Sequence, residues 1–215
     1  MEFSEDGTLK IYEAGPAGSF ANNIYVVVDT ETNEAAFIDA PDEPEKSIAV
    51  AEAAGVTPKT ILLTHSHGDH TAGIATLKAR YGCELVASAK EVGLQPGQPD
   101  RGVNHGDEVR VGNLAFRVLS VPGHTPGSTT YICGKSAFVG DTLFPGGPGH
   151  SRSGDLLKQE IASITTQLYA LPEDTTIYPG HGETTTIGES KAEYAVFAGK
   201  EHPADLHGDV NWLLS

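Results

Sequence analysis

Thr64-His65-Ser66-His67-Gly68-Asp69-His70 is the densest concentration of metal-binding side chains in this sequence, and it directly follows the apolar run 61–63. Three histidines and one aspartate fall within six consecutive positions. Imidazole and carboxylate groups together suit a borderline divalent metal such as zinc, or iron or manganese. The stretch therefore predicts a metal-binding loop at the end of a strand.

The spacing of these ligands favours two neighbouring metal sites over one. His65 and His67 are two positions apart, so on an extended backbone their side chains point to the same side. Asp69 and His70 are adjacent, and Gly68 before them is expected to let the chain turn, so that this pair faces a different point. The alternative is a histidine-rich surface loop that takes up metal only incidentally.

Length and composition bound the class of protein. The 215 residues suit one sizeable domain, 1–215, with 39% hydrophobic and 20% charged residues. The net charge of −15 argues against nucleic-acid binding, because so acidic a surface repels phosphate backbones. We expect no membrane span, since no apolar run approaches about 20 residues.

The first residues and the two cysteines predict the compartment. Residues 1–6 are acidic and polar, unlike a signal peptide, so we expect a cytoplasmic protein. Cys83 and Cys133 have no metal-type spacing and lie near apolar, strand-like segments. We expect both to be buried free thiols.

Periodicity and turn residues predict two β-rich blocks with helices between and after them. Asp42, with Pro44 and Glu45 after it, predicts a helix start, and Gly55 predicts the stop after Ala54. The other helices are expected over 72–81 and 155–171, with a helical or irregular end from about 190, and residues 95–105 as a loop. The expected strands are 24–28, 35–38, 59–63, 84–87, 108–111, 114–121, 128–132, 136–139 and 175–178. Two face-to-face sheets with helices outside follow from this order.

Three later residues share the context of the first motif. His124, Asp141 and His181 each lie just after an expected strand, in a glycine-containing turn. Loops at strand ends commonly carry functional residues on a rigid sheet. Any one of them alone reads as a turn residue, but together with 65–70 they supply five histidines and two aspartates. That number is enough for two metals that share a bridging ligand.

With these residues in place, the chain resembles a metallo-β-lactamase-fold hydrolase over nearly its full length. The resemblance lies in a strand-end acid, Asp39, the His-X-His-X-Asp-His motif at 65–70 and the three later ligands in order. It implies an α/β (α+β) fold, the four-layer αββα sandwich, and two divalent metal ions, most readily zinc. It also implies a ligand set: His65, His67 and His124 on the first metal, Asp69, His70 and His181 on the second, Asp141 bridging both, and Asp39 orienting a ligand.

Within the superfamily, residues 122–128 (Pro-Gly-His-Thr-Pro-Gly-Ser) and 140–144 (Gly-Asp-Thr-Leu-Phe) resemble the glyoxalase II-like, hydroxyacylglutathione hydrolase-like branch. The classical β-lactamases place Cys or Ser where Asp141 stands, which argues against antibiotic hydrolysis. The family's Cys-Gly-Arg after the bridging Asp is replaced by residues 147–152 here, and its basic C-terminal region has only Lys191 and Lys200 as counterparts. The resemblance therefore does not extend to the glutathione-binding region.

The implied chemistry is hydrolysis of a small-molecule acyl compound. A water held between two dications loses a proton near neutral pH, and the resulting hydroxide attacks a carbonyl carbon while Asp69 orients it. A thiolate, whose conjugate acid has a pKa of about 8.5, leaves without a general acid, which favours a thioester or a lactone over an amide. The alternatives are a mononuclear-iron persulfide dioxygenase on the same fold, a lactonase, and a metal-binding protein without catalysis.

Other residues are candidates for the substrate pocket. His150 and Arg152 lie in the glycine- and proline-rich loop after Asp141, where a substrate could pass. Phe144 could line the entrance, and His207 could fold over it from the C-terminal tail. The alternative for the loop residues is a solvated loop. The oligomeric state is left open.

Overall fold

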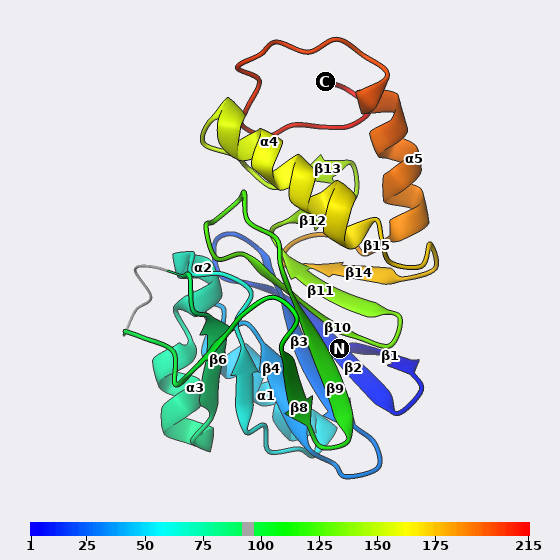
Figure 1. The fold of residues 1–215 in the computed structure, drawn as a ribbon. Helices are drawn as coiled ribbons and strands as arrows, with labels where there is room; N and C mark the ends of the chain where they lie inside the picture. Colours follow the sequence, from blue (N-terminus) through cyan, green and yellow to red (C-terminus); the bar gives the residue numbers. More distant parts are fainter. Residues whose placement is uncertain (92–96) are drawn as a thin grey trace.

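Two sheets packed face to face form the centre of the molecule (Figure 1). The structure is a computed structural model, and it describes residues 1–91 and 97–215. The first sheet has seven strands that lie in chain order: β1 (Glu2–Asp6), β2 (Leu9–Ala17), β3 (Asn22–Asp29), β4 (Ala35–Ile38), β5 (Thr60–Leu62), β6 (Glu84–Ser88) and β7 (Arg101–Val103). Strands β1 to β4 pair antiparallel and β4 to β7 pair parallel.

The second sheet has six strands in the order β15-β14-β11-β10-β9-β8. Their bounds are β8 (Glu108–Val111), β9 (Leu114–Ser120), β10 (Thr129–Cys133), β11 (Ser136–Gly140), β14 (Thr176–Pro179) and β15 (Thr185–Thr186). Only β11 and β14 pair in parallel. Two short strands, β12 (Leu143–Phe144) and β13 (Gly147–Pro148), pair with each other beside this sheet.

Helices cover the outer face of each sheet, which confirms the αββα sandwich (Figure 1). The first sheet carries α1 (Pro44–Ala54) and α3 (Ile74–Tyr81), with the short α2 (Gly68–Thr71) between β5 and α3. The second carries α4 (Gly154–Ser163), which continues as a π-helical turn, η1 (Ile164–Leu168), and α5 (Ile187–Ala198).

Alternation along single strands explains why both faces of each sheet are covered. In β4, Ala36 and Ile38 belong to the core between the sheets, whereas Ala35 and Phe37 pack under α1 and α3. A strand with both faces buried reads as a continuous apolar run. Phe116 and Phe138 are fully buried between the sheets, and burial of such a side chain stabilises the fold by roughly 1.5–3 kcal/mol.

The predicted start of α1 is wrong in its detail. Glu43 precedes the helix with a left-handed backbone (φ 56°) and gives it no side-chain cap. The Asp42 carboxylate accepts a hydrogen bond from the N–H of Glu43 at 2.9 Å and makes no capping bond to the first turn of the helix. The predicted end is confirmed, because Gly55 adopts a left-handed conformation (φ 70°) after Ala54.

Three other segments differ from the sequence prediction. Strands β1 and β2 were not predicted, because their polar residues face solvent and hide the pattern of the apolar ones. The expected loop 95–105 contains β7, which pairs with β6; residues 95 and 96 of it lie outside the described residues. The expected helix 155–171 changes to the π-helical turn at Ile164.

The cysteine prediction is confirmed: Cys83 and Cys133 are free and buried. Among the described residues, no helix combines the length and the apolar character that a membrane crossing requires.

Candidate metal centre

The seven predicted ligands lie in the segments that follow four strands, five of them on loops and two, Asp69 and His70, on the short helix α2. Residues 64–70 follow β5 of the first sheet, while His124, Asp141 and His181 follow β9, β11 and β14 of the second. Their ligand atoms gather in two neighbouring groups of three and four residues. The change of direction between the two ligand pairs of the first motif comes from α2, which begins at Gly68. Gly68 does not adopt a positive φ, so the predicted role of its backbone freedom is wrong.

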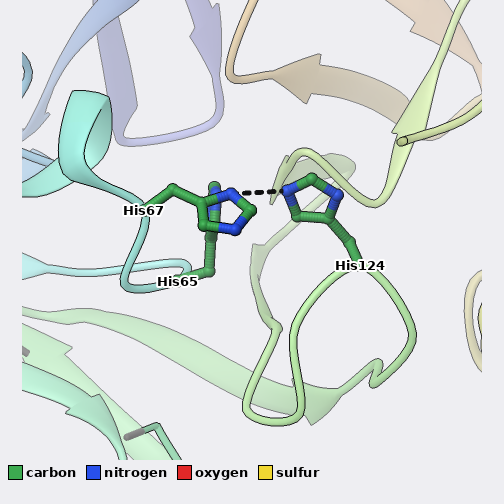
Figure 2. A group of neighbouring side chains, drawn as sticks. All are labelled: His65, His67 and His124. Carbon is green, nitrogen blue, oxygen red and sulfur yellow. Dashed lines mark hydrogen bonds between the residues drawn. The ribbon is translucent and has the colours of Figure 1, made fainter. Parts of the chain in front are cut away.

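His65, His67 and His124 form the first group (Figure 2). Nδ1 of His67 lies 3.1 Å from Nε2 of His65 and 2.9 Å from Nε2 of His124. Asp141 Oδ2 is 4.0 Å from His65 Nε2 and 3.7 Å from His124 Nε2. Three imidazole nitrogens therefore face one point, with a carboxylate oxygen at its edge.

Asp69, His70, Asp141 and His181 form the second group. Nε2 of His70 and of His181 are 3.4 Å apart, and Asp69 Oδ2 lies 3.3 Å and 3.2 Å from them. Asp141 reaches His70 with Oδ1 at 3.3 Å and His181 with Oδ2 at 3.4 Å. Asp141 thus lies between the two groups.

Hydrogen bonds to the outer ring nitrogens assign the tautomers. Nδ1 of His70 donates to Asp39 at 2.7 Å, that of His124 to the carbonyl of His150 at 3.0 Å, and that of His181 to the carbonyl of Phe20 at 2.8 Å. An acceptor on Nδ1 places the proton there and leaves the Nε2 lone pair toward the group. These rings are arranged to bind a cation.

Asp39 organises ligands of both groups. Its carboxylate accepts from the Thr64 backbone N–H at 2.7 Å and from the Thr64 hydroxyl at 2.8 Å. Because that hydroxyl donates to Asp39, it accepts from Nδ1 of His65, which lies 3.1 Å away. Asp39 therefore fixes His70 directly and His65 through Thr64, as expected for the partner that orients a metal ligand.

Polar atoms that lack a hydrogen-bond partner also indicate that the centre fits a metal. Asp141 Oδ1 is buried, and its contact with Nε2 of His70 at 3.3 Å lacks hydrogen-bond geometry, so this oxygen has no hydrogen-bond partner among the described residues. The Nε2 atoms of His65 and His124, which their Nδ1 contacts leave unprotonated, both face Nδ1 of His67 at hydrogen-bonding distance. Gly180 permits the close packing, since a Cβ there would lie 2.4 Å from Asp141 Oδ1. Five imidazoles and two carboxylates suit a pair of divalent cations.

The two groups differ in protonation when no metal is bound. Burial lowers the pKa of His65 well below its ordinary value, lowers that of His67, and lowers that of His124 to about 4. These rings are neutral at neutral pH.

The second group is charged. Burial alone would lower the pKa of His70 and His181, but the neighbouring carboxylates outweigh it. They hold the pKa of His70 well above its ordinary value and that of His181 at about 9. Burial acts to raise the pKa of Asp69 and Asp141, yet their ion pairs with His181 and His70 hold both well below the usual range.

The structure adds a residue that sequence reasoning missed. Asn22 is buried at the start of β3, and its amide donates to Asp69 Oδ2 at 3.0 Å. It also lies 3.3 Å from Nε2 of His70. No motif marks it, because an asparagine at a strand start is ordinary turn chemistry; only the pairing of residue 22 with His181 brings it to the centre.

The predicted pocket residues divide into three that border the centre and one that does not. Phe144 and His150 line a pocket of about 390 Å³ that includes His124 and Asp141. Arg152 lines a second pocket, of about 460 Å³, with His67 and His124. His207 is exposed, donates to the carbonyl of Asp205 at 2.6 Å, and lines neither of these pockets.

Comparison with known proteins supports the family resemblance that the sequence showed. Residues 17–181 match the metallo-beta-lactamase superfamily. A hydroxyacylglutathione hydrolase of Chelativorans sp. (strain BNC1) is 40% identical over 170 residues, which cover 78% of this chain and 64% of that protein. The hydroxyacylglutathione hydrolase GloC of Haemophilus influenzae is 36% identical over 198 residues, covering 82% of this chain and 92% of GloC.

Solved structures share the fold. ETHE1 from Myxococcus xanthus has a TM-score of 0.76 and 32% identity, covering 88% of this chain and 86% of its own. TTHA1623, solved in a di-iron-bound form, has a TM-score of 0.72 and 30% identity, and the match covers 84% of this chain and 96% of TTHA1623. The chain spans slightly under two thirds of the length of several curated relatives that it matches.

Proposed function

Because the chain belongs to the metallo-β-lactamase superfamily, in its glyoxalase II-like branch, we propose that it is a metal-dependent hydrolase of small acyl thioesters or activated esters. The observation that carries the proposal is the convergence of seven ligands in two adjacent groups with Asp141 between them. His65, His67 and His124 would hold one ion, Asp69, His70 and His181 the other, and Asp141 both. Zinc is the metal that we propose for the site.

Two ions at this centre would supply Lewis acidity and lower the pKa of a shared water toward neutrality. The chain's own residues orient the reacting groups. Asp69 is ionised at neutral pH and keeps its Oδ2 toward the second group, where Asn22 holds it. In that position Asp69 would accept a hydrogen bond from the attacking water. This contact would point the lone pair of the water oxygen at the carbonyl carbon of the substrate.

Two pockets that meet at His124 would receive the two arms of a thioester. The pocket with Arg152 also contains the apolar Pro126 and Leu156. The Glu91 carboxylate in its wall is buried and accepts the hydroxyls of Ser66 and Thr125, so the exposed charge in this pocket is that of Arg152. Arg152 is exposed and, among the described residues, has no salt-bridge partner, although the chain carries a net charge of −15. An unpaired guanidinium beside the centre favours a substrate with a carboxylate.

The other pocket carries a histidine paired with an acid. Nδ1 of His150 donates to Asp209 at 2.9 Å, and both line the pocket with Phe144. This contact leaves Nε2 of His150 free to bond a polar group of the thiol arm, while Phe144 packs on its apolar part. The relatives' names suggest a glutathione thioester as the first substrate to try.

The test is metal analysis of protein purified without added metal, followed by a panel of thioesters, lactones and oxyesters. We expect two ions per chain and hydrolysis of thioesters that carry a carboxylate. Arg152→Gln should raise KM about tenfold for anionic thioesters and leave neutral ones unchanged, while Arg117→Gln, an exposed arginine on β9, serves as the control. One iron per chain with oxygen uptake would instead identify the dioxygenase, and a fully metallated but inert protein would contradict hydrolysis.

A further inference from the structure

Glu91 is a buried carboxylate that belongs to neither metal group. It lies just after β6 and is 4% exposed. Burial of an acidic side chain is unfavourable unless hydrogen bonds compensate. Its two carboxylate oxygens are therefore expected to have specific partners, and those partners show what the residue does.

Each oxygen accepts a hydroxyl from a different metal-binding loop. The Ser66 hydroxyl donates to Oε2, and the Thr125 hydroxyl donates to Oε1. Ser66 stands between His65 and His67, and Thr125 directly follows His124. One carboxylate thus connects the loops that supply all three ligands of the first group.

The contact on the Thr125 side is held by more than one bond. The Ser128 hydroxyl accepts from the Thr125 N–H at 3.0 Å and lies 2.8 Å from the Thr125 hydroxyl. Gly127 packs directly on the backbone of Glu91, where a Cβ would lie 2.6 Å from the Glu91 nitrogen. The loop therefore rests on Glu91 and has little freedom to shift.

His67 needs this support most. Nδ1 of His65 and of His124 each have an acceptor outside the group, namely the Thr64 hydroxyl and the His150 carbonyl. Among the described residues, the His67 ring has hydrogen-bond partners only within the group, His65 and His124. The position of His67 thus depends on its backbone, which Ser66 ties to Glu91.

We infer that Glu91 is a positioning residue for the first metal group. It joins a loop of the first sheet to a loop of the second, so that three imidazoles meet at the spacing that one ion requires. Partners that orient metal ligands typically contribute 10- to 100-fold in metal affinity, on the order of the effect expected here. The inference depends on the metal centre and not on the substrate.

The experiment measures Co²⁺ binding by equilibrium dialysis and by the visible absorption of the bound ion. A His181→Ala background weakens the second group, and a His67→Ala background weakens the first. We expect Glu91→Ala to weaken Co²⁺ binding about 10- to 100-fold in the His181→Ala background and to change the absorption spectrum. In the His67→Ala background it should change affinity less than twofold.

Glu91→Gln should restore most of the affinity, because an amide can accept from one hydroxyl and donate to the other. Asp29→Ala is the matched control, since Asp29 is a buried carboxylate that accepts from Thr32 and Asn113, outside the metal centre. Equal losses in both backgrounds, or the same loss in Asp29→Ala, would overturn the inference.

If Glu91→Ala does not fold, Ser66→Ala and Thr125→Val each remove one of the two contacts, and unchanged Co²⁺ affinity in both would contradict it. Loss of metal affinity without any hydrolysis by the wild type would leave this inference standing and refute the proposed function.

Discussion

The two halves of the metal centre are built from similar ligands but differ in charge. The first group has three neutral imidazoles whose pKa values burial lowers. The second combines two carboxylates with two histidines whose pKa values those carboxylates raise. The first half is therefore ready to accept a cation, whereas the second must first release protons. Charge, more than geometry, distinguishes the two sites.

The halves also differ in the acids behind them. Asp39 bonds directly to His70 of the second group, and its oxygens are fully used. Behind the first group, Glu91 acts through two hydroxyls, and Glu160 is buried with no hydrogen bond to either carboxyl oxygen among the described residues. Behind the second group, the acid Asp39 has hydrogen-bond partners for both carboxylate oxygens. Behind the first group, Glu91 has such partners and Glu160 has none.

The largest expected difference between the two metal groups follows from removing Asp141, which contacts both of them. Asp141→Ala should lower affinity at the second group, where it is one of two carboxylates, about 1000-fold, and at the first about tenfold. Hydrolysis should fall by roughly 1000-fold or more. Stepwise metal titration measures both affinities, and Asp155→Ala, an exposed acid on α4, is the control. Equal losses at both sites would show that the halves are not distinct.

A smaller effect concerns Glu160, which lies against Gly123 behind the first group. Burial raises its pKa to about 9, and the charge of Asp141 adds to this effect. A raised folded-state pKa means that folding favours the protonated acid, so this contribution is complete below the ordinary pKa of 4.5 and is lost as the pH rises toward 9.

Glu160→Gln should therefore stabilise the metal-free protein on the order of 3 kcal/mol near pH 8 and have little effect near pH 4.5. Urea unfolding at both pH values measures the difference. A variant that is less stable than wild type at pH 8 would show that the ionised carboxylate has a partner.

A third test concerns the proton release that accompanies metal binding. Since His181, with a pKa of about 9, and His70 are protonated at pH 7.5 without metal, an ion at the second group must displace their protons. Affinity there should rise with pH, about tenfold per unit for each proton released, up to pH 9.

The first group should show no such slope above pH 6, because His124 has a pKa of about 4. Calorimetry of the His67→Ala and His181→Ala variants, in two buffers with different ionisation enthalpies, counts the protons. Equal release in the two variants would contradict the charge difference.

Much of the fold follows from local pattern. Continuous apolar runs such as 35–38 are strands buried on both faces, and Gly55 ends α1 as predicted. The N-terminal strands escaped prediction because β1 lies at a sheet edge, where its residues are mostly exposed. The start of α1 at Pro44 lies within the predicted signal, but Asp42 bonds the N–H of the next residue and does not cap the helix.

The sequence by itself determined the ligand types, their order and their placement after strands, because metal chemistry restricts those choices to histidine and carboxylate and strand ends restrict their location. The grouping of the ligands was implied by the family resemblance, whereas only the tertiary structure decided which ring nitrogen each one offers. The tertiary structure also decided that Asn22 and Glu91 support them. The contacts around the centre join residues that lie 25 to 161 positions apart, and no local pattern specifies them.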